Sequence, residues 1–274
     1  MGSIPTRSAE IAIHKMGGMV LLAKRGMFTV SLDKEYQQYH IDAATWSIQH
    51  ISWELPLQLT GVYRNHPTSI GEDGQEAYTN RMDTETTQIT AIEEIAKGLQ
   101  AAEGPALMLG DFNIALGRLQ DELQHSLVVE WGKRESIHDP HIPPSSPAIQ
   151  LMRIIDEQQL LILNGRYGQD SAETTYEAIV RKKQGNETTH TTIDYALCRQ
   201  DMANKITSMT VETNNDAGVL SDHRPLRVSV QCKQRHEQQA NVQNQGIGPQ
   251  WIHQSTGHSW TYLVSRRWHG KRRG

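Results

Sequence analysis

The sequence contains little cysteine, little phenylalanine and no long apolar run. Two cysteines among 274 residues, Cys198 and Cys232, exclude a disulfide framework and a four-ligand zinc site, and isolated thiols are typical of a reducing compartment. No apolar run approaches the roughly 20 residues that a membrane helix needs, and the N-terminus lacks the basic and apolar segments of a signal peptide. We therefore expect an intracellular protein that does not cross a membrane.

A surplus of positive charge is also lacking. The net charge of −4 and the pI near 6.3 exclude attraction of nucleic acid by the chain as a whole, so such binding would depend on local basic segments. Hydrophobic residues make up 37%, which is enough for one large core. We expect one domain over residues 16–232 and a disordered, Gln- and Asn-rich tail over residues 233–274.

The basic end of this tail, residues 266–273, suits nuclear import or the binding of a polyanion. It is equally explained as read-through beyond the domain end. With the first alternative, the protein is expected in the nucleus.

Periodic apolar residues predict a mixed α/β fold. Two Gly-bounded runs, 17–24 and 27–32, predict a β-hairpin, and Ile89, Ile92 and Leu99 recur at the spacing of an amphipathic helix. Further along the chain, Pro147 is expected to open a second helix. The remaining expected strands are 44–48, 55–62, 106–109, 160–163, 206–211 and 226–230, together with a second hairpin formed by 174–180 and 191–197.

The apolar run 106–109 ends abruptly at Gly110, Asp111 and Asn113. A carboxylate and an amide that leave one strand end together suit a hard cation and a phosphate oxygen. The alternative is an Asx turn, in which both side chains bond to their own backbone. Asn164, at the end of another predicted strand, is equally well explained as a residue near a site and as a turn-forming Asn.

Three further blocks accompany this strand end in a fixed order. They are Gly61-Val62-Tyr63-Arg64-Asn65, Thr191-Thr192-Ile193-Asp194-Tyr195-Ala196-Leu197 and Ser221-Asp222-His223-Arg224-Pro225-Leu226. Together with Gly110-Asp111-Phe112-Asn113 they resemble the endonuclease/exonuclease/phosphatase superfamily, which includes DNase I-like nucleases, abasic-site endonucleases and LINE-type retrotransposon endonucleases. The resemblance covers roughly residues 16–230 and implies an α/β sandwich of two sheets that lacks the N-terminal strands of the family.

The resemblance also implies a hydrolytic site. His223 would act on the attacking water or on the developing oxyanion, and Asp194 would orient its imidazole. Asp222 and Asp111 would hold one Mg²⁺ or Mn²⁺, with Asp111 also positioning the water. Asn113 would bond a non-bridging phosphate oxygen, and Tyr63 would contact the scissile phosphate.

DNA is the expected substrate. Arg181, Lys182 and Lys183 form a basic hairpin tip that is a candidate contact with a nucleic-acid backbone, although a solvated turn explains it equally well. A superfamily phosphatase or lipid phosphodiesterase has the same core motifs. A third hypothesis is an impaired remnant or a nucleic-acid-binding module, because Glu10, the one acidic residue before residue 16, does not reproduce the setting of the family's metal-binding Glu.

Overall fold

The computed structural model describes residues 11–16, 19–24, 27–38, 41–64, 74–117, 119, 134, 145–182, 185–212 and 223–232. The predicted tail lies outside these residues. In chain order the elements are β1 (Ile11–Met16), β2 (Met19–Lys24), β3 (Phe28–Gln38), β4 (Ile41–His50), β5 (Leu57–Arg64), α1 (Gly74–Gln100), β6 (Ala106–Asp111), α4 (Ser146–Glu157), β7 (Leu160–Ile162), η1 (Gln169–Ser171), β8 (Tyr176–Lys182), β9 (Gly185–Thr191), β10 (Asp194–Arg199), η2 (Gln200–Lys205), β11 (Ile206–Val211) and β12 (Leu226–Val230).

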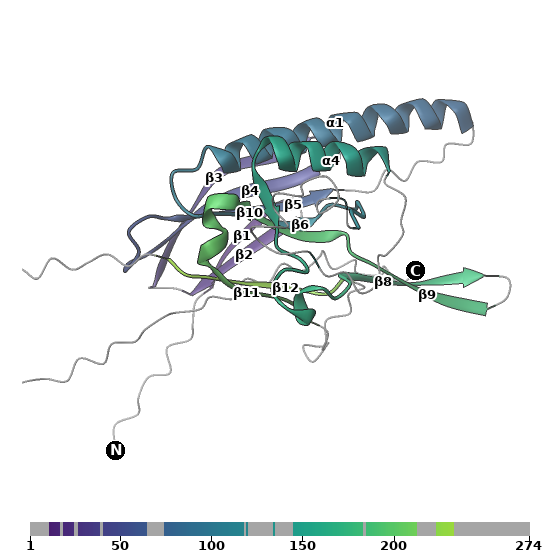
Figure 1. Cartoon of the computed structure of the whole chain (residues 1–274). Coiled ribbons are helices and arrows are strands. Elements are labelled where there is room, and N and C mark those ends of the chain that lie inside the picture. The colour runs from purple at the N-terminus through teal and green to yellow at the C-terminus, as the bar shows by residue number, and fades with distance from the viewer. Residues whose placement is uncertain are drawn as a thin grey trace, which may run out of the picture.

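A six-stranded sheet in the order β3-β4-β5-β6-β10-β7 forms the centre of the molecule (Figure 1). Strands β5 and β6 are parallel, and the long helix α1 makes the crossover between them. The remaining pairs of this sheet are antiparallel. All six residues of β6 are buried, because both faces of the sheet are covered at this strand.

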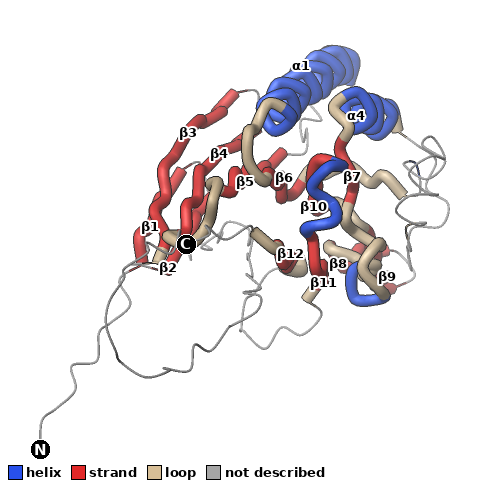
Figure 2. Tube along the Cα trace, turned by 60° about the vertical axis from the view of Figure 1, so that its left-hand side comes forward, coloured by secondary structure: helices blue, strands red, loops and turns tan. Residues whose placement is uncertain are grey.

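Helices α1 and α4 lie side by side on one face of the sheet (Figure 2). The predicted stripe of α1, including Ile89, Ile92 and Leu99, packs into the core cluster on this face. The start of α4 follows from its sequence, because the hydroxyl of Ser145 accepts a hydrogen bond from the backbone N–H of Ala148 and a proline occupies the first turn. Both predicted helices are therefore confirmed.

The small antiparallel sheet β11–β12 covers the opposite face of the main sheet. Its apolar residues, such as Met209 and Val228, pack in one core cluster with Leu107, Leu109 and Ala196 of the central strands. Two sheets packed face to face, with helices outside, confirm the predicted α/β architecture. Within the described ranges, neither helix carries an apolar stretch that would cross a membrane.

Both predicted hairpins have the wrong partners. Strand β2 pairs with β1, and β3 pairs with β4, so the runs 17–24 and 27–32 do not form a hairpin with one another. The Gly17-Gly18 dipeptide is a two-residue turn signal, which favours pairing of the strands on either side of it. Likewise β8 pairs with the polar strand β9, whereas the apolar run that begins at Asp194 joins the main sheet as β10.

Candidate active site

Strand β6 ends in the site because Gly110 lets it approach β5 closely. A Cβ atom at Gly110 would lie 1.8 Å from the backbone oxygen of Val62, so no larger residue fits there without displacing the neighbouring strand. Asp111 follows as the last residue of β6 and exposes only 6% of its surface. The close contact between β5 and β6 thus fixes the backbone position from which the Asp111 side chain projects.

The sheet register aligns acidic residues in one row. Tyr63 of β5 and Asp194 of β10 are the partners of Asp111 on either side, and Asp42 of β4 is the next partner beyond Tyr63. Partner residues project from the same face of a sheet, about 5 Å apart between strands. That face is the one that β11–β12 covers. Tyr63 is therefore in the same row as Asp111, and its contact with a phosphate stays a prediction.

His223 reaches this row from the segment that leads into β12. Its backbone forms an isolated bridge with Tyr176, and the two rings lie 4.8 Å apart between centroids. The next backbone N–H, of Arg224, donates to the carbonyl of Thr175 at 2.7 Å. The hydroxyl of Thr175 in turn accepts from the backbone N–H of Asp194 at 3.0 Å. Thr175 therefore joins the segment that carries His223 to the strand that carries Asp194.

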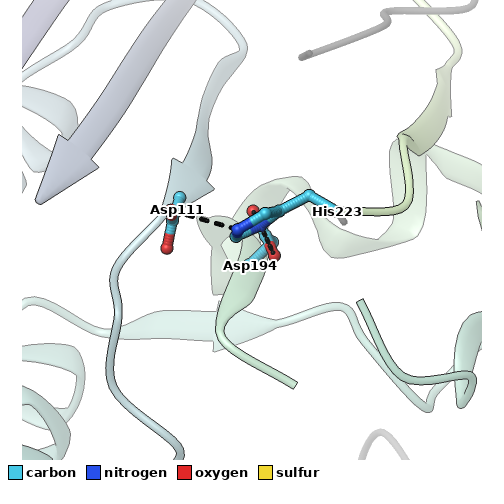
Figure 3. Close-up of side chains that lie close together, drawn as sticks. All are labelled: Asp111, Asp194 and His223. Carbon is cyan, nitrogen blue, oxygen red and sulfur yellow. Dashed lines mark hydrogen bonds and ion pairs between the residues drawn. The ribbon is translucent and has the colours of Figure 1, made fainter. Parts of the chain in front are cut away.

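The imidazole of His223 lies between two carboxylates (Figure 3). Its Nδ1 atom is 2.9 Å from Oδ2 and 3.1 Å from Oδ1 of Asp194, and its Nε2 atom is 3.8 Å from Oδ2 of Asp111. The contact with Asp194 is a hydrogen bond, whereas the 3.8 Å separation from Asp111 is too long to be one. In the neutral ring, an Asp194 that accepts from Nδ1–H leaves the Nε2 lone pair directed toward Asp111, where it is able to take a proton.

Asp111 and Asn113 form the predicted Asx turn and the predicted cluster at the same time. The backbone N–H of Asn113 donates to Oδ1 of Asp111 at 2.9 Å, and its side-chain amide donates to Oδ2 at 3.2 Å. Asn113 has a positive φ of 49°, a conformation that Asn tolerates better than most residues. The turn holds the Asp111 carboxylate in place, so the two interpretations are not exclusive.

Asn164 supports β10 from the adjoining strand end. It is buried, donates from its side-chain amide to the carbonyl of Asp194 at 3.1 Å, and accepts from the backbone N–H of Ala196 at 2.9 Å. The guanidinium of Arg134 donates to the carbonyl of Asn164 at 2.9 Å. Asn164 therefore joins β10 to the end of β7, beyond the residues through which those two strands pair.

The donor set suits a divalent cation. One ligand atom each from Asp111, Asp194 and His223 lie within 4.8 Å of one another. Two carboxylates and an imidazole, with no thiolate among them, match the ligand preference of Mn²⁺ and, through their oxygens, of Mg²⁺. Both oxygens of Asp194 bond His223, and both oxygens of Asp111 accept hydrogen bonds from Asn113, so a cation would share these oxygens with their present partners.

Several predicted residues are not placed. Asp222 and Lys183 lie outside the described residues, as do the side chains of Arg181 and Lys182, although the backbone of β8 extends to Lys182. Sequence reasoning missed Thr175, which is hidden within a run of β-branched residues. It also missed the burial of Arg64, which the alternation of β5 signals, because Arg64 is in phase with the buried residue Val62.

No protein-family model matches the sequence, and no curated protein matches it either. Among solved structures, the chain is similar to the endonuclease domain of TRAS1, a telomere-specific non-LTR retrotransposon, with 20% identity and a TM-score of 0.41 over 74% of this chain and 70% of that one. It is similar to the 3'-5' exonuclease NExo from Neisseria meningitidis, with 17% identity and a TM-score of 0.41 over 68% of this chain and 64% of that one. An AP endonuclease from Archaeoglobus fulgidus is similar at 14% identity, with the same TM-score and coverage. These are structures of the endonuclease/exonuclease/phosphatase family, and the likeness is one of overall fold.

Proposed function

We propose that the chain is a metal-dependent phosphodiesterase that hydrolyses DNA, of the type found in retroelements. The observation that carries this proposal is the position of His223 between Asp194 and Asp111 at a strand-end row of carboxylates. The order of the four motif blocks supports phosphodiester chemistry of the superfamily type, and the basic hairpin tip supports a nucleic-acid substrate.

In the proposed mechanism, His223 is the proton-transfer residue. Asp194 holds the proton on Nδ1 and stabilises the imidazolium that forms when Nε2 takes a proton from the attacking water. Oδ2 of Asp111 lies 3.8 Å from Nε2 of His223. A water molecule would form hydrogen bonds to both atoms after the two side chains move slightly apart. Asp111 therefore has the position to orient the nucleophile.

Asp111, and Asp222 by resemblance, would hold the divalent cation. When bound, the cation would polarise the phosphate and neutralise charge on the leaving oxygen. The phenol of Tyr63 lies in the same row and is proposed to contact a phosphate oxygen. The same contact is proposed for the side-chain amide of Asn113, which would exchange one of its present hydrogen bonds, to Asp111 or to the Arg64 carbonyl, for the phosphate. Arg181, Lys182 and Lys183 are proposed to contact the DNA backbone, and the basic segment 266–273 to direct the protein to the nucleus.

Nicking of supercoiled plasmid by the purified chain tests the proposal. We expect slow cleavage in Mn²⁺ that EDTA removes and that His223→Ala abolishes. The matched control is His190→Ala, which removes an exposed imidazole on β9 and is expected to cleave at the wild-type rate. Cleavage that survives both His223→Ala and Asp111→Ala would identify a contaminating nuclease. No cleavage of plasmid or abasic DNA at any Mn²⁺ concentration would reject the proposal in favour of an impaired remnant, and hydrolysis of phosphomonoesters alone would favour a phosphatase.

A further inference from the structure

The last residue of β5 is an arginine that lies beneath the site. Arg64 exposes 2% of its surface and is among the largest fully buried side chains of the described residues. Successive residues of a strand project from opposite faces, so Arg64 projects from the face opposite to its neighbour Tyr63. Its register partner is Ile41, which belongs to the core cluster under the helices. Arg64 is therefore shielded from any substrate on the face that carries Asp111.

The guanidinium of Arg64 bonds the backbone that follows β6. Its Nη1 atom donates to the carbonyl of Asn113 at 3.1 Å and, more weakly, to that of Phe112 at 3.4 Å. In the opposite direction, the side-chain amide of Asn113 donates to the backbone carbonyl of Arg64 at 2.5 Å. Residue 64 thus holds Asn113 at two points, once through its side chain and once through its backbone.

The same asparagine holds the site carboxylate. Asn113 donates to Oδ1 of Asp111 from its backbone and to Oδ2 from its side chain, and Oδ2 is the oxygen that faces His223. A continuous series of contacts therefore runs from Arg64 through Asn113 to Asp111 and ends at His223. Every link in the series is a polar contact between side chains or backbone groups of the described residues.

A buried guanidinium is costly unless it forms good hydrogen bonds, and an apolar side chain of similar volume often stabilises a core better. Bonds from a charged donor to carbonyl oxygens are stronger than neutral ones and fix the geometry of the acceptors. An arginine that projects from the same face as this apolar cluster is thus poorly explained by core packing alone. Its bonds to the turn provide a reason for its presence.

We propose that Arg64 is a positioning residue that sets the orientation of the Asp111 carboxylate by holding the turn at Asn113. The inference rests on the proposed function for its catalytic consequence, but the effect on the turn is independent of activity. Loss of the guanidinium would leave Asn113 with its backbone bond to residue 64 and would free its own carbonyl. The turn, and with it Asp111, would then occupy a wider range of orientations.

Arg64→Met tests this proposal, because methionine is apolar, unbranched and flexible and cannot donate a hydrogen bond. The matched control is Arg199→Met at the far end of β10, where Arg199 also donates to two backbone carbonyls, those of Gln100 and Ala102. The readout is hydrogen exchange of the backbone amide of Asn113. A general loss of stability would speed exchange throughout the protein and would not affect this amide selectively. In Arg64→Met we expect this amide to exchange about tenfold faster relative to amides of β11, with no such difference in Arg199→Met.

Activity supplies the second readout. We expect kcat to fall by roughly tenfold to a hundredfold in Arg64→Met, because orientation at the reacting centre is lost. Arg64→Lys, which keeps one charged donor, should recover part of both effects and is the variant to measure if Arg64→Met does not fold. Relative exchange at Asn113 that is unchanged in both Arg64 variants would overturn the proposal. A wild-type chain without activity would refute the proposed function instead, and the exchange data would still decide the role of Arg64.

Discussion

Asp194 and His223 are 29 positions apart in the sequence, yet Nδ1 of the histidine lies 2.9 Å from Oδ2 of the aspartate, at the end of the central sheet. The contact depends on two separate supports. Strand β10 aligns Asp194 with Asp111, and Thr175 connects the backbone on both sides of the pair. The pair is therefore held by the fold, and its removal should affect chemistry more than stability.

Asp194→Asn should reverse the hydrogen bonding of His223. An amide nitrogen placed against Nδ1 donates, so the ring proton would move to Nε2 and the base would be lost. We expect kcat for plasmid cleavage to fall by about a hundredfold to ten-thousandfold with little change in the melting temperature. Asp201→Asn, which alters an exposed aspartate beyond the other end of β10, is the control and should cleave normally. A fall of less than threefold in kcat for Asp194→Asn would show that the pair is not catalytic.

Asp111→Asn should weaken binding of a divalent cation. The substitution keeps the shape of the side chain but removes its negative charge from a buried position, so the Mn²⁺ dissociation constant should rise by at least about tenfold. Titration calorimetry with Mn²⁺ and no DNA measures this directly. The matched control is Asp170→Asn, which removes the same charge from an exposed position on η1. This change should leave the Mn²⁺ dissociation constant unchanged. Equal Mn²⁺ dissociation constants for Asp111→Asn and the wild type would show that Asp111 does not bind the cation.

Gly110→Ala should destabilise the fold at the site. The added Cβ would meet the backbone oxygen of Val62 at 1.8 Å, and the strand cannot move without disturbing Asp111. We expect the free energy of unfolding to fall by about 1 to 3 kcal/mol, measured by urea denaturation. Gly98→Ala is the control, because Gly98 lies in α1 with nothing within 4 Å of the added carbon. That change should stabilise the protein by about 0.5 to 1 kcal/mol.

Stability should fall at alkaline pH because of a buried thiol. Burial raises the pKa of Cys198 from 9.0 to about 12, and burial likewise raises the pKa of Tyr167 from 10.0 to about 12. The unfolded chain releases these protons at lower pH than the folded chain does. Between about pH 9 and pH 12 the folded chain therefore holds more protons than the unfolded chain, and the free energy of unfolding falls as the pH rises. For Cys198 alone the slope approaches about 1.4 kcal/mol per pH unit.

Urea unfolding at several pH values, in the presence of a reductant, measures this slope. Cys198→Ala should lower stability at every pH yet flatten the slope just above pH 9.0, the ordinary pKa of the thiol. In that variant Cys232, whose pKa burial raises from 9.0 to about 11, keeps its contribution, as does Tyr167 at higher pH, so the slope is reduced and not abolished. An identical slope in the wild type and in Cys198→Ala would show that the thiol titrates normally in the folded protein.

The local elements were predictable because their signals are local. The 3.6-residue spacing of apolar residues in α1, the proline at the start of α4 and the apolar run that stops at Gly110 each act within a few residues. The choice of Asp111, Asp194 and His223 came from the order of motif blocks, and the structure brings these three side chains together. Their chemical roles remain predictions.

Strand partners and buried polar contacts could not be predicted in the same way. Pairing of β2 with β1, and of β10 with β6, depends on which alignment buries the most apolar surface across the whole sheet, and a strand pattern does not name its partner. Thr175 and Arg64 act through backbone groups far away in the sequence, which no residue pattern encodes. The sequence by itself determined which strand ends carry carboxylates and a histidine. Only the tertiary structure decided that Asp194 meets His223 and that a buried arginine holds the turn at Asp111, because packing of β12 and β5 against their neighbours sets those distances.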